Sequence, residues 1–424
     1  MGRFTGLLGI VLILGIAFLM SNNRRKINYR VVLSGLLIQI ALAVFILKIP
    51  LGKRMFGWIG AEVTKVLNLA HEGAVFVFGP LVDSDLLSRV FGPSNNLIFF
   101  FTIIPTIIFV AVLVSMAYHW GIMQRIVKGV AWLMYKIMGV SGSEALSNVS
   151  SAFVGQVEAQ IMIKPYIKGM TMSELLASMT GSMACIAGGV MAVYIALGVP
   201  AEYLIAASLM AAPGALVISK IVWPETEESE TKRAVTLKVK PQSYNILDAI
   251  SHGASDGLRV GLNVTAMLIG FIALIALADF LLGGIGHFLA GWGWSLDFIG
   301  INLDQLNMNQ ILGSLFSIFA RAMGVPGAEA HAAGALLGTK MVVNEFVAYL
   351  DLSQIKDTLD PKTMVIVSFA LCGFANFSSI AIQVGGIGEL EPSRRTDLAK
   401  LGFKALICGT LASYMSATIA GMLM

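Results

Sequence analysis

Apolar residues run along this chain in long stretches that have no polar face. Eight stretches free of Asp, Glu, Lys and Arg approach or exceed the roughly 20 apolar residues that span a bilayer. They are 4–20, 31–47, 97–118, 175–199, 203–219, 262–278, 363–388 and 405–424. A surface helix of a soluble protein would show polar residues at 3.6-residue spacing. The pattern therefore predicts eight transmembrane helices. The first is predicted to be a retained span, because no A-x-A cleavage site follows it.

Basic residues in the connecting loops predict the orientation of these spans. The first loop holds Arg24, Arg25, Lys26 and Arg30, which places it in the cytoplasm and the N-terminus outside. The loops after spans three, five and seven then bring their basic residues to the same side. These residues are Arg125, Lys128 and Lys136, then Lys220, Lys232, Arg233, Lys238 and Lys240, then Arg394, Arg395 and Lys400. We expect a multi-pass protein of the plasma (cytoplasmic or inner) membrane with both termini outside.

Two further apolar segments, 146–167 and 309–349, are broken by turn residues. The breaks are at Gly155-Gln156-Val157-Glu158 and at Gly324-Val325-Pro326-Gly327. The orientation derived from the basic loops leaves no room for a further crossing, so each segment must enter and leave the membrane on the same side. Both segments are therefore predicted to be re-entrant hairpins, which open to opposite sides. Each is followed by a span with a Gly- or Asn-rich centre, at 187–189 and 373–376. This repeated order predicts an inverted-repeat secondary transporter with its site at the midplane.

Amphipathic segments flank several spans, at 53–72, 121–139 and 246–260, and predict helices lying in the membrane interface. The glycine-rich stretch 283–293 predicts a loop after the sixth span. The polar stretch 222–245 predicts a cytoplasmic linker between two halves of the chain.

Composition agrees with a membrane protein and narrows the chemistry. Hydrophobic residues make up 57% of the 424 residues and charged residues 13%, against about 25% charged in soluble proteins. The net charge is +4 and the basic residues form no stripe, which argues against a protein that binds nucleic acid. Three cysteines build no disulfide framework, and the five histidines show no metal spacing. The sequence shows no nucleophile–base pair and no H-E-x-x-H motif, so it does not indicate an enzyme.

Polar residues at membrane depth are the candidates for function. A carboxylate there costs about 2.5–3.5 kcal/mol unless it is paired or faces water, and it usually marks a pathway. Glu158 and Glu345 lie in corresponding hairpins; the alternative is that each is a hydrogen-bonded or snorkelling side chain. In the seventh span Asn376, Ser378 and Ser379 offer donors and acceptors to a hydroxyl-rich ligand, or they join helices.

Three motifs resemble the signatures of the concentrative nucleoside transporter family, in order and over nearly the whole chain. They are Gly155-Gln156-Val157-Glu158, Asn344-Glu345-Phe346-Val347-Ala348-Tyr349 and Cys372-Gly373-Phe374-Ala375-Asn376-Phe377-Ser378-Ser379. The resemblance implies an all-α, cation-coupled nucleoside symporter that imports a uridine-like substrate. It also implies a homotrimer in the bilayer, in which a transport domain moves like an elevator against a scaffold.

The resemblance also implies a division of the chain into domains. Residues 1–120 and 246–300 form the scaffold, with spans one to three, span six and interfacial helices. Residues 121–221 and 301–424 form the two halves of the transport domain, each with one hairpin and two spans. Residues 222–245 link these halves.

By the same resemblance, the motifs divide the ligand between them. The nucleobase set is Gly155, Gln156, Val157, Glu158, Val190 and Leu262. The ribose set is Glu345, Asn376, Ser379 and Phe374. The family usually has Thr or Ser where this chain has Val157, which leaves the base preference open.

The cation site that the resemblance implies is degenerate. It consists of Ser151, Val154, Cys185 and Ile186, where sodium-coupled members have Asn and Ser at the first and third positions. Sodium prefers oxygen ligands, and a thiol is a poor substitute. The one metal ion that the resemblance implies is Na⁺. Because this site is degenerate, H⁺ is favoured over Na⁺ as the coupling ion, with Glu345 or Glu158 as the proton carrier. An uncoupled facilitator or channel is the alternative, and a membrane-embedded enzyme is disfavoured.

Overall fold

The computed structural model describes residues 2–92, 98–231, 243–295 and 301–424. These residues form helices joined by turns and short connections, and no strand occurs among them. The predicted all-helical architecture is therefore confirmed for this part of the chain. Most of the predicted linker 222–245, namely residues 232–242, lies outside the described residues.

The first part of the chain forms two long apolar helices and then a series of shorter ones that leads to a third long helix. The helices are α1 (Gly2–Leu19), α2 (Tyr29–Leu47), α3 (Pro50–Asn68), α4 (Ala70–Phe78), α5 (Ser84–Phe91) and α6 (Phe99–His119). Pro50 starts α3, where a missing N–H is tolerated. The segment 53–72, predicted as one interfacial helix, is divided between α3 and α4 at Leu69.

The middle of the chain contains the first predicted hairpin and the broken fourth span. Its helices are α7 (Ile122–Met138), α8 (Gly142–Ser151), α9 (Glu158–Ile161), α10 (Lys164–Ile167), α11 (Met172–Ala184), α12 (Gly188–Ala196) and α13 (Ala201–Val222). Capping boxes start α8 at Ser141–Glu144 and α11 at Thr171–Glu174. The predicted break near 187–189 lies between α11 and α12.

The last part repeats this order after one long helix. Its helices are α14 (Ile246–Gly291), α15 (Met308–Met323), α16 (Ala330–Val342), α17 (Glu345–Ile355), α18 (Pro361–Leu371), α19 (Phe377–Leu390) and α20 (Arg395–Leu423). Short 3₁₀ turns lie at Arg24–Lys26, Gly79–Val82, Leu303–Gln305, Lys356–Thr358 and Pro392–Arg394. The break predicted at 373–376 separates α18 from α19.

Helix α14 corrects two predictions. The interfacial segment 246–260, span six and most of the stretch 283–293 form one continuous helix of 46 residues. Its glycines permit packing instead of ending the helix: a Cβ at Gly253 would lie 2.8 Å from Val112 Cα, and one at Gly257 would lie 2.6 Å from Ile108 Cα. Both neighbours belong to α6, so the glycines let two backbones approach closely.

The second predicted hairpin also differs in detail. The turn at Gly324-Val325-Pro326-Gly327 is present and folds α15 back against α16. A second break, at Val343 and Asn344, divides α16 from α17 and places Glu345 at the first position of α17. This break contains neither Gly nor Pro; the Asn344 side chain accepts a hydrogen bond from Val347 N at 2.9 Å and starts a new helix.

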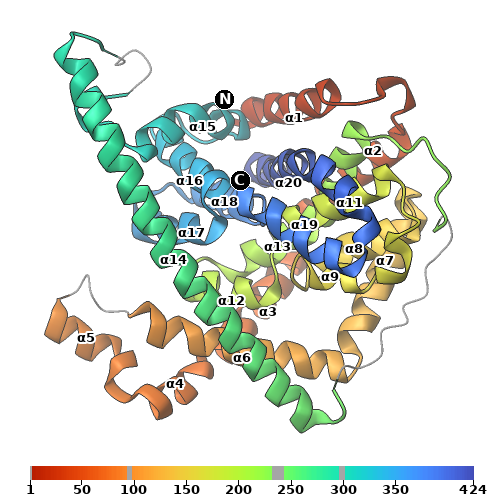
Figure 1. Ribbon diagram of the computed structural model, residues 1–424, viewed down its shortest axis with the longest axis horizontal. Coiled ribbons are helices and arrows are strands. Elements are labelled where there is room, and N and C mark those ends of the chain that lie inside the picture. The colour runs from red at the N-terminus through yellow and green to blue at the C-terminus, as the bar shows by residue number, and fades with distance from the viewer. Residues whose placement is uncertain (1, 93–97, 232–242, 296–300) are drawn as a thin grey trace.

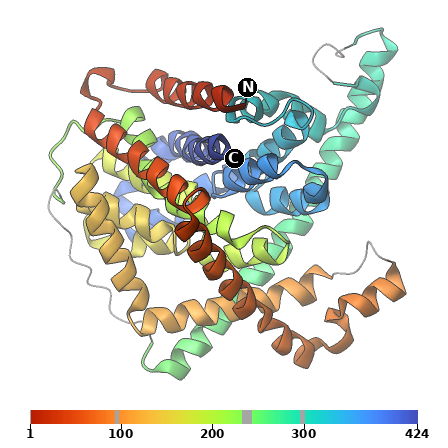
Figure 2. The same ribbon diagram turned by 180° about the vertical axis from the view of Figure 1, so that it is seen from behind.

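Most helices form a packed body, and the long helix α14 lies along one side of it as an exposed arm. In the body, α20 packs against α11, α13 and α18. Of its most apolar 18-residue stretch 83% is buried, whereas only 6% of the corresponding stretch of α14 is buried. Figure 1 shows α14 crossing one side of the molecule beside α6, with α4 and α5 projecting nearby. Figure 2 shows α2 and then α3 crossing the opposite side of the body, with α1 along its upper edge.

Among the described residues, six helical segments are long and apolar enough to cross a membrane, by length and composition; one of them joins α11 and α12 across their break. They are Tyr29–Leu47, Phe99–His119, Met172–Ala196, Ala201–Val222, Ile246–Gly291 and Pro392–Leu423. The other two predicted spans coincide with shorter apolar helices, Thr5–Leu19 and Pro361–Leu371. Span seven is shorter because the break at its centre divides it between α18 and α19.

Candidate functional site

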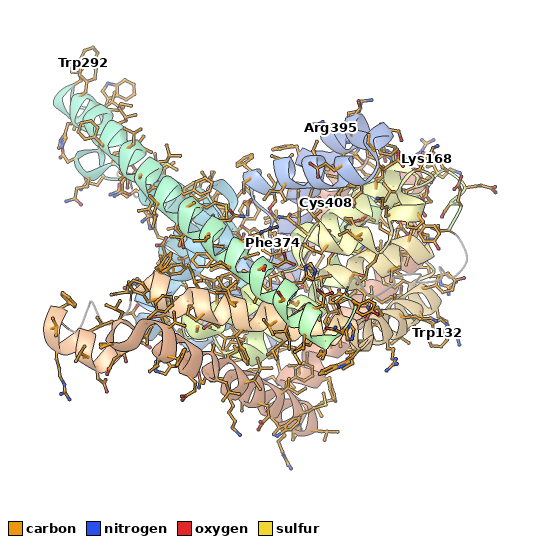
Figure 3. All side chains as sticks on the ribbon, turned by 60° about the horizontal axis from the view of Figure 1, so that its bottom comes forward. Trp132, Lys168, Trp292, Phe374, Arg395 and Cys408 are labelled. Carbon is orange, nitrogen blue, oxygen red and sulfur yellow. The ribbon has the colours of Figure 1, made fainter. Side chains whose placement is uncertain are left out.

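Two helix breaks meet inside the body. The backbone N–H of Phe374, in the break between α18 and α19, donates to the carbonyl of Cys185, in the break between α11 and α12, at 3.3 Å. Gly373 has a φ of 140°, and a Cβ there would lie 2.7 Å from Ala184 O. A side chain at Gly373 would therefore both strain the backbone and separate the breaks. Figure 3 shows Phe374 near the middle of the molecule, far from Trp292 at the tip of α14.

A buried carboxylate lies beside these breaks. Glu345 is 6% exposed, and its two oxygens accept hydrogen bonds from Asn376 Nδ2 at 2.9 Å and from Tyr194 Oη at 3.2 Å. The structure thus brings together two residues of the predicted ribose set, Glu345 and Asn376, from α17 and the start of α19. Ser379, also buried, lies one turn further along α19.

The Asn376 side chain is fixed by its own helix. Its Oδ1 atom accepts from the backbone N–H of Ser379 at 2.9 Å and from Ser378 Oγ at 2.7 Å, so it caps the N-terminus of α19. The amide nitrogen must then face the other way, toward Glu345. The N-termini of α17 and α19 both lie at this point, and their positive dipole ends favour the carboxylate.

Tyr194 is a site residue that sequence reasoning missed. It is fully buried on α12 and stacks on Tyr349 at a centroid distance of 4.1 Å, while Phe346 meets it edge-on at 5.9 Å. Tyr349 in turn donates to the carbonyl of Ser368 at 2.8 Å. A tyrosine inside an apolar helix needs an acceptor for its hydroxyl, and that need was a usable signal.

Lys340 is a second residue that was missed. This lysine on α16 is 1% exposed, and its ammonium donates to the carbonyl of Ala370 at 2.7 Å, close to the C-terminal end of α18. A cation is favourable there because the last carbonyls of a helix lack intrahelical partners. The rule that flagged Glu345, a charge inside an apolar segment, applies equally to Lys340.

The predicted nucleobase motif forms the turn between α8 and α9. Gly155 has no side chain where the Glu158 carboxylate lies, since a Cβ there would overlap Glu158 Oε2. Gln156 Oε1 accepts from Gln383 Nε2 at 3.4 Å, and Val157 packs on Gly386; both partners are on α19. Glu158 itself is exposed, unlike Glu345.

The other two predicted nucleobase residues lie on different helices. Val190 is in the first turn of α12, half-buried against the core. Leu262 is on α14, where 46% of its surface is exposed and the helix packs mainly along α6. Their contact with a nucleobase stays a prediction.

The four residues of the degenerate cation site are all buried, and its two polar side chains, Ser151 and Cys185, contact different residues. Ser151 Oγ donates to the carbonyl of Ser147 at 2.8 Å and lies 3.0 Å from Ser182 Oγ. The Cys185 thiol points to the carbonyl of Ser208 at 4.0 Å. The remaining two, Val154 and Ile186, are buried apolar residues that have only their backbone carbonyls to offer. No cluster of three or more His, Cys, Asp or Glu side chains that would suit a metal occurs among the described residues.

Comparison with known families covers nearly the whole chain. A family model described as Na⁺ dependent nucleoside transporter C-terminus matches residues 203–421, and the corresponding N-terminus model matches residues 8–81. A model described as nucleoside recognition (Gate) matches residues 100–201.

Individual relatives agree with the family models. The chain is 37% identical to the nucleoside permease NupC of Helicobacter pylori, over 98% of this chain and 96% of that protein. It is 43% identical to an uncharacterized transporter of Haemophilus influenzae, over 100% of this chain and 98% of that one.

Solved structures show the same fold. CNTnw in an inward-facing, substrate-bound state matches with a TM-score of 0.92 and 40% identity, over 100% of this chain and 98% of that one. An outward-facing variant of the same protein matches equally well, with a TM-score of 0.92. The chain therefore belongs to the concentrative nucleoside transporter family: it is a multi-pass membrane transporter of nucleosides and not an enzyme.

Proposed function

We propose that this transporter imports nucleosides across the plasma membrane by symport with a cation, and that the cation is H⁺ rather than Na⁺. Alternating access is of the elevator type. Residues 121–221 and 301–424 form the moving transport domain; residues 1–120 and 246–300 form the scaffold, and the protein assembles as a homotrimer with both termini outside. The availability of solved inward-facing and outward-facing states of the relative CNTnw supports a moving domain.

The observation that carries the substrate proposal is the pairing of Glu345 with Asn376. A carboxylate with two lone-pair-bearing oxygens accepts from vicinal hydroxyl groups, and an amide both donates and accepts, which suits a ribose. The donors on Tyr194 and Asn376 hold the carboxylate in place. Ser379 and Phe374 complete the ribose end, and the motif 155–158 with Val190 and Leu262 binds the nucleobase.

The cation proposal is supported by the side chains around Ser151. Ser151 offers one short hydroxyl, which donates to the carbonyl of Ser147 and lies 3.0 Å from Ser182 Oγ, at the position where the resemblance gives sodium-coupled members the longer amide of Asn. The thiol of Cys185 points toward the carbonyl of Ser208 and offers a soft ligand to a hard cation. A proton needs no such ligand shell, and Glu345 or Glu158 carries it.

The test is uptake of labelled uridine into proteoliposomes with an inward proton gradient, an inward sodium gradient or neither. Accumulation above equilibrium driven by protons alone is the expected result, and Glu345→Gln in correctly inserted protein should abolish it. Accumulation driven by sodium would overturn the proton proposal. Equilibration without accumulation under every gradient would favour an uncoupled facilitator.

A further inference from the structure

One face of α19 touches both ends of the proposed site. Asn376, Ser379, Gln383 and Gly386 are spaced three or four residues apart, so they lie on the same side of the helix. The first two belong to the ribose end beside Glu345. The last two contact the tip of the first hairpin, through Gln156 and Val157.

Gln383 is the buried polar residue on this face whose role is not yet explained. Its side chain is 0% exposed, and its Nε2 atom donates to the carbonyl of Met179 on α11 at 3.3 Å and to Gln156 Oε1 at 3.4 Å. Its Oε1 atom is buried without a hydrogen-bond partner. A methionine of similar length would avoid this unpaired acceptor, so stability alone does not account for the glutamine.

The orientation of both amides follows from one unambiguous partner. A backbone carbonyl only accepts, so the Gln383 nitrogen must face Met179 O. The second hydrogen of the same nitrogen then points to Gln156 and needs an acceptor there, which fixes Gln156 Oε1 on the α19 side. The Gln156 NH₂ group consequently points away from α19, and this residue is half-exposed where Gln383 is buried.

We infer that Gln383 is a positioning residue for nucleobase specificity: it turns Gln156 so that this side chain donates to an acceptor atom on the base. The ligand class that follows is a nucleoside whose base carries a carbonyl oxygen or an unprotonated ring nitrogen toward Gln156. The inference rests on the proposed assignment of Gln156 to the nucleobase. Val157 packs on Gly386, one turn further along α19, so the hairpin tip contacts this helix at a second point.

The test compares two competitors of labelled uridine uptake in proteoliposomes. One is unlabelled uridine, and the other is phenyl riboside, whose ring has no hydrogen-bonding group. Gln383→Met should raise the inhibition constant of uridine about tenfold, the loss expected for one hydrogen bond, and leave that of phenyl riboside unchanged. The maximal uptake rate should change less than the KM.

A matched control and a double variant separate positioning from general damage. Gln39→Met on α2 removes another fully buried glutamine that also has an unpaired Oε1 and that donates to Met210 O and Ser416 Oγ rather than to this face. It should leave the ratio of the uridine constant to the phenyl riboside constant as in the unaltered protein. Gln156→Ala should raise the inhibition constant of uridine relative to that of phenyl riboside, as Gln383→Met does. Adding Gln383→Met to Gln156→Ala should change it no further, because the two residues act through one bond.

The outcomes are distinguishable. An unaltered ratio in Gln383→Met, or independent multiplicative effects of the two variants, would overturn the inference. Should Gln383→Met fail to reach the membrane, Gln383→Glu keeps the shape and replaces the donating nitrogen with oxygen, and the same ratio is measured. Absence of uridine uptake by the unaltered protein would refute the proposed function instead.

Discussion

The double role of Asn376 allows its contribution to the ligand site to be separated from its contribution to the fold. Its Oδ1 atom caps α19, and its Nδ2 atom donates to Glu345 at 2.9 Å. Asn376→Asp retains a good capping oxygen but replaces the donor with a second oxygen facing the buried carboxylate. Asn376→Ala removes both interactions.

The magnitudes follow from these two bonds. A hydrogen bond to a charged group contributes about 1.5–3 kcal/mol, and an N-cap contributes about 1 kcal/mol. We expect Asn376→Asp to raise the KM for uridine about 10- to 150-fold. Its Tm in detergent should also fall although the cap of α19 is kept, because the new carboxylate faces Glu345 in a buried site. Asn376→Ala should show the same loss of affinity and a lower Tm.

The assay is initial-rate uptake of labelled uridine, together with a thermal-unfolding measurement on the same preparations. The control is Asn307→Ala, which removes the cap of α15, where Asn307 Oδ1 accepts from Gln310 N at 2.9 Å. It should lower Tm and leave the KM unaltered. An Asn376→Asp variant that transports uridine with the ordinary KM would refute the reasoning.

Three further predictions concern the donors, the helix packing and a buried ion pair. Tyr194→Phe removes one donor to the buried carboxylate and should raise the KM for uridine about five- to tenfold, measured as above. Gly257→Leu should destabilise the α14–α6 contact and lower Tm or membrane yield, whereas Gly270→Leu, where no atom lies within 4 Å, should not. Lys220→Met leaves its ion-pair partner Glu144 buried and unpaired, and should destabilise by about 3–5 kcal/mol in thermal unfolding; unaltered Tm would contradict this.

The helix breaks at the site were predictable from sequence, because Gly- and Asn-rich centres interrupt apolar runs at 187–189 and 373–376. The break before Glu345 was not, since no glycine or proline marks it and the asparagine cap that starts α17 follows α16 almost directly. The rule that glycine-rich positions interrupt a helix also gave the wrong prediction for α14, which continues through its glycines. The atoms of α6 that occupy the space beside Gly253 and Gly257 are known only once the two helices are packed.

Single polar residues show the other limit of sequence reasoning. Glu345 and Asn376 were identified because an acid and a helix-breaking amide stand out in apolar segments. Lys340, Tyr194 and Gln383 have similar settings, but their roles depend on partners from distant segments: a carbonyl of α18, a carboxylate of α17 and the tip of the first hairpin. Sequence spacing along one helix does not reveal such partners.

The backbone bond between Phe374 and Cys185 has a consequence for biogenesis. During synthesis the break between α11 and α12 is completed long before its partner, because α13 to α18 must be made first. Until then the Cys185 carbonyl lacks this donor in a low-dielectric surrounding, which is unfavourable. The packing of the first half of the protein around this carbonyl is therefore completed only when the second break docks against it.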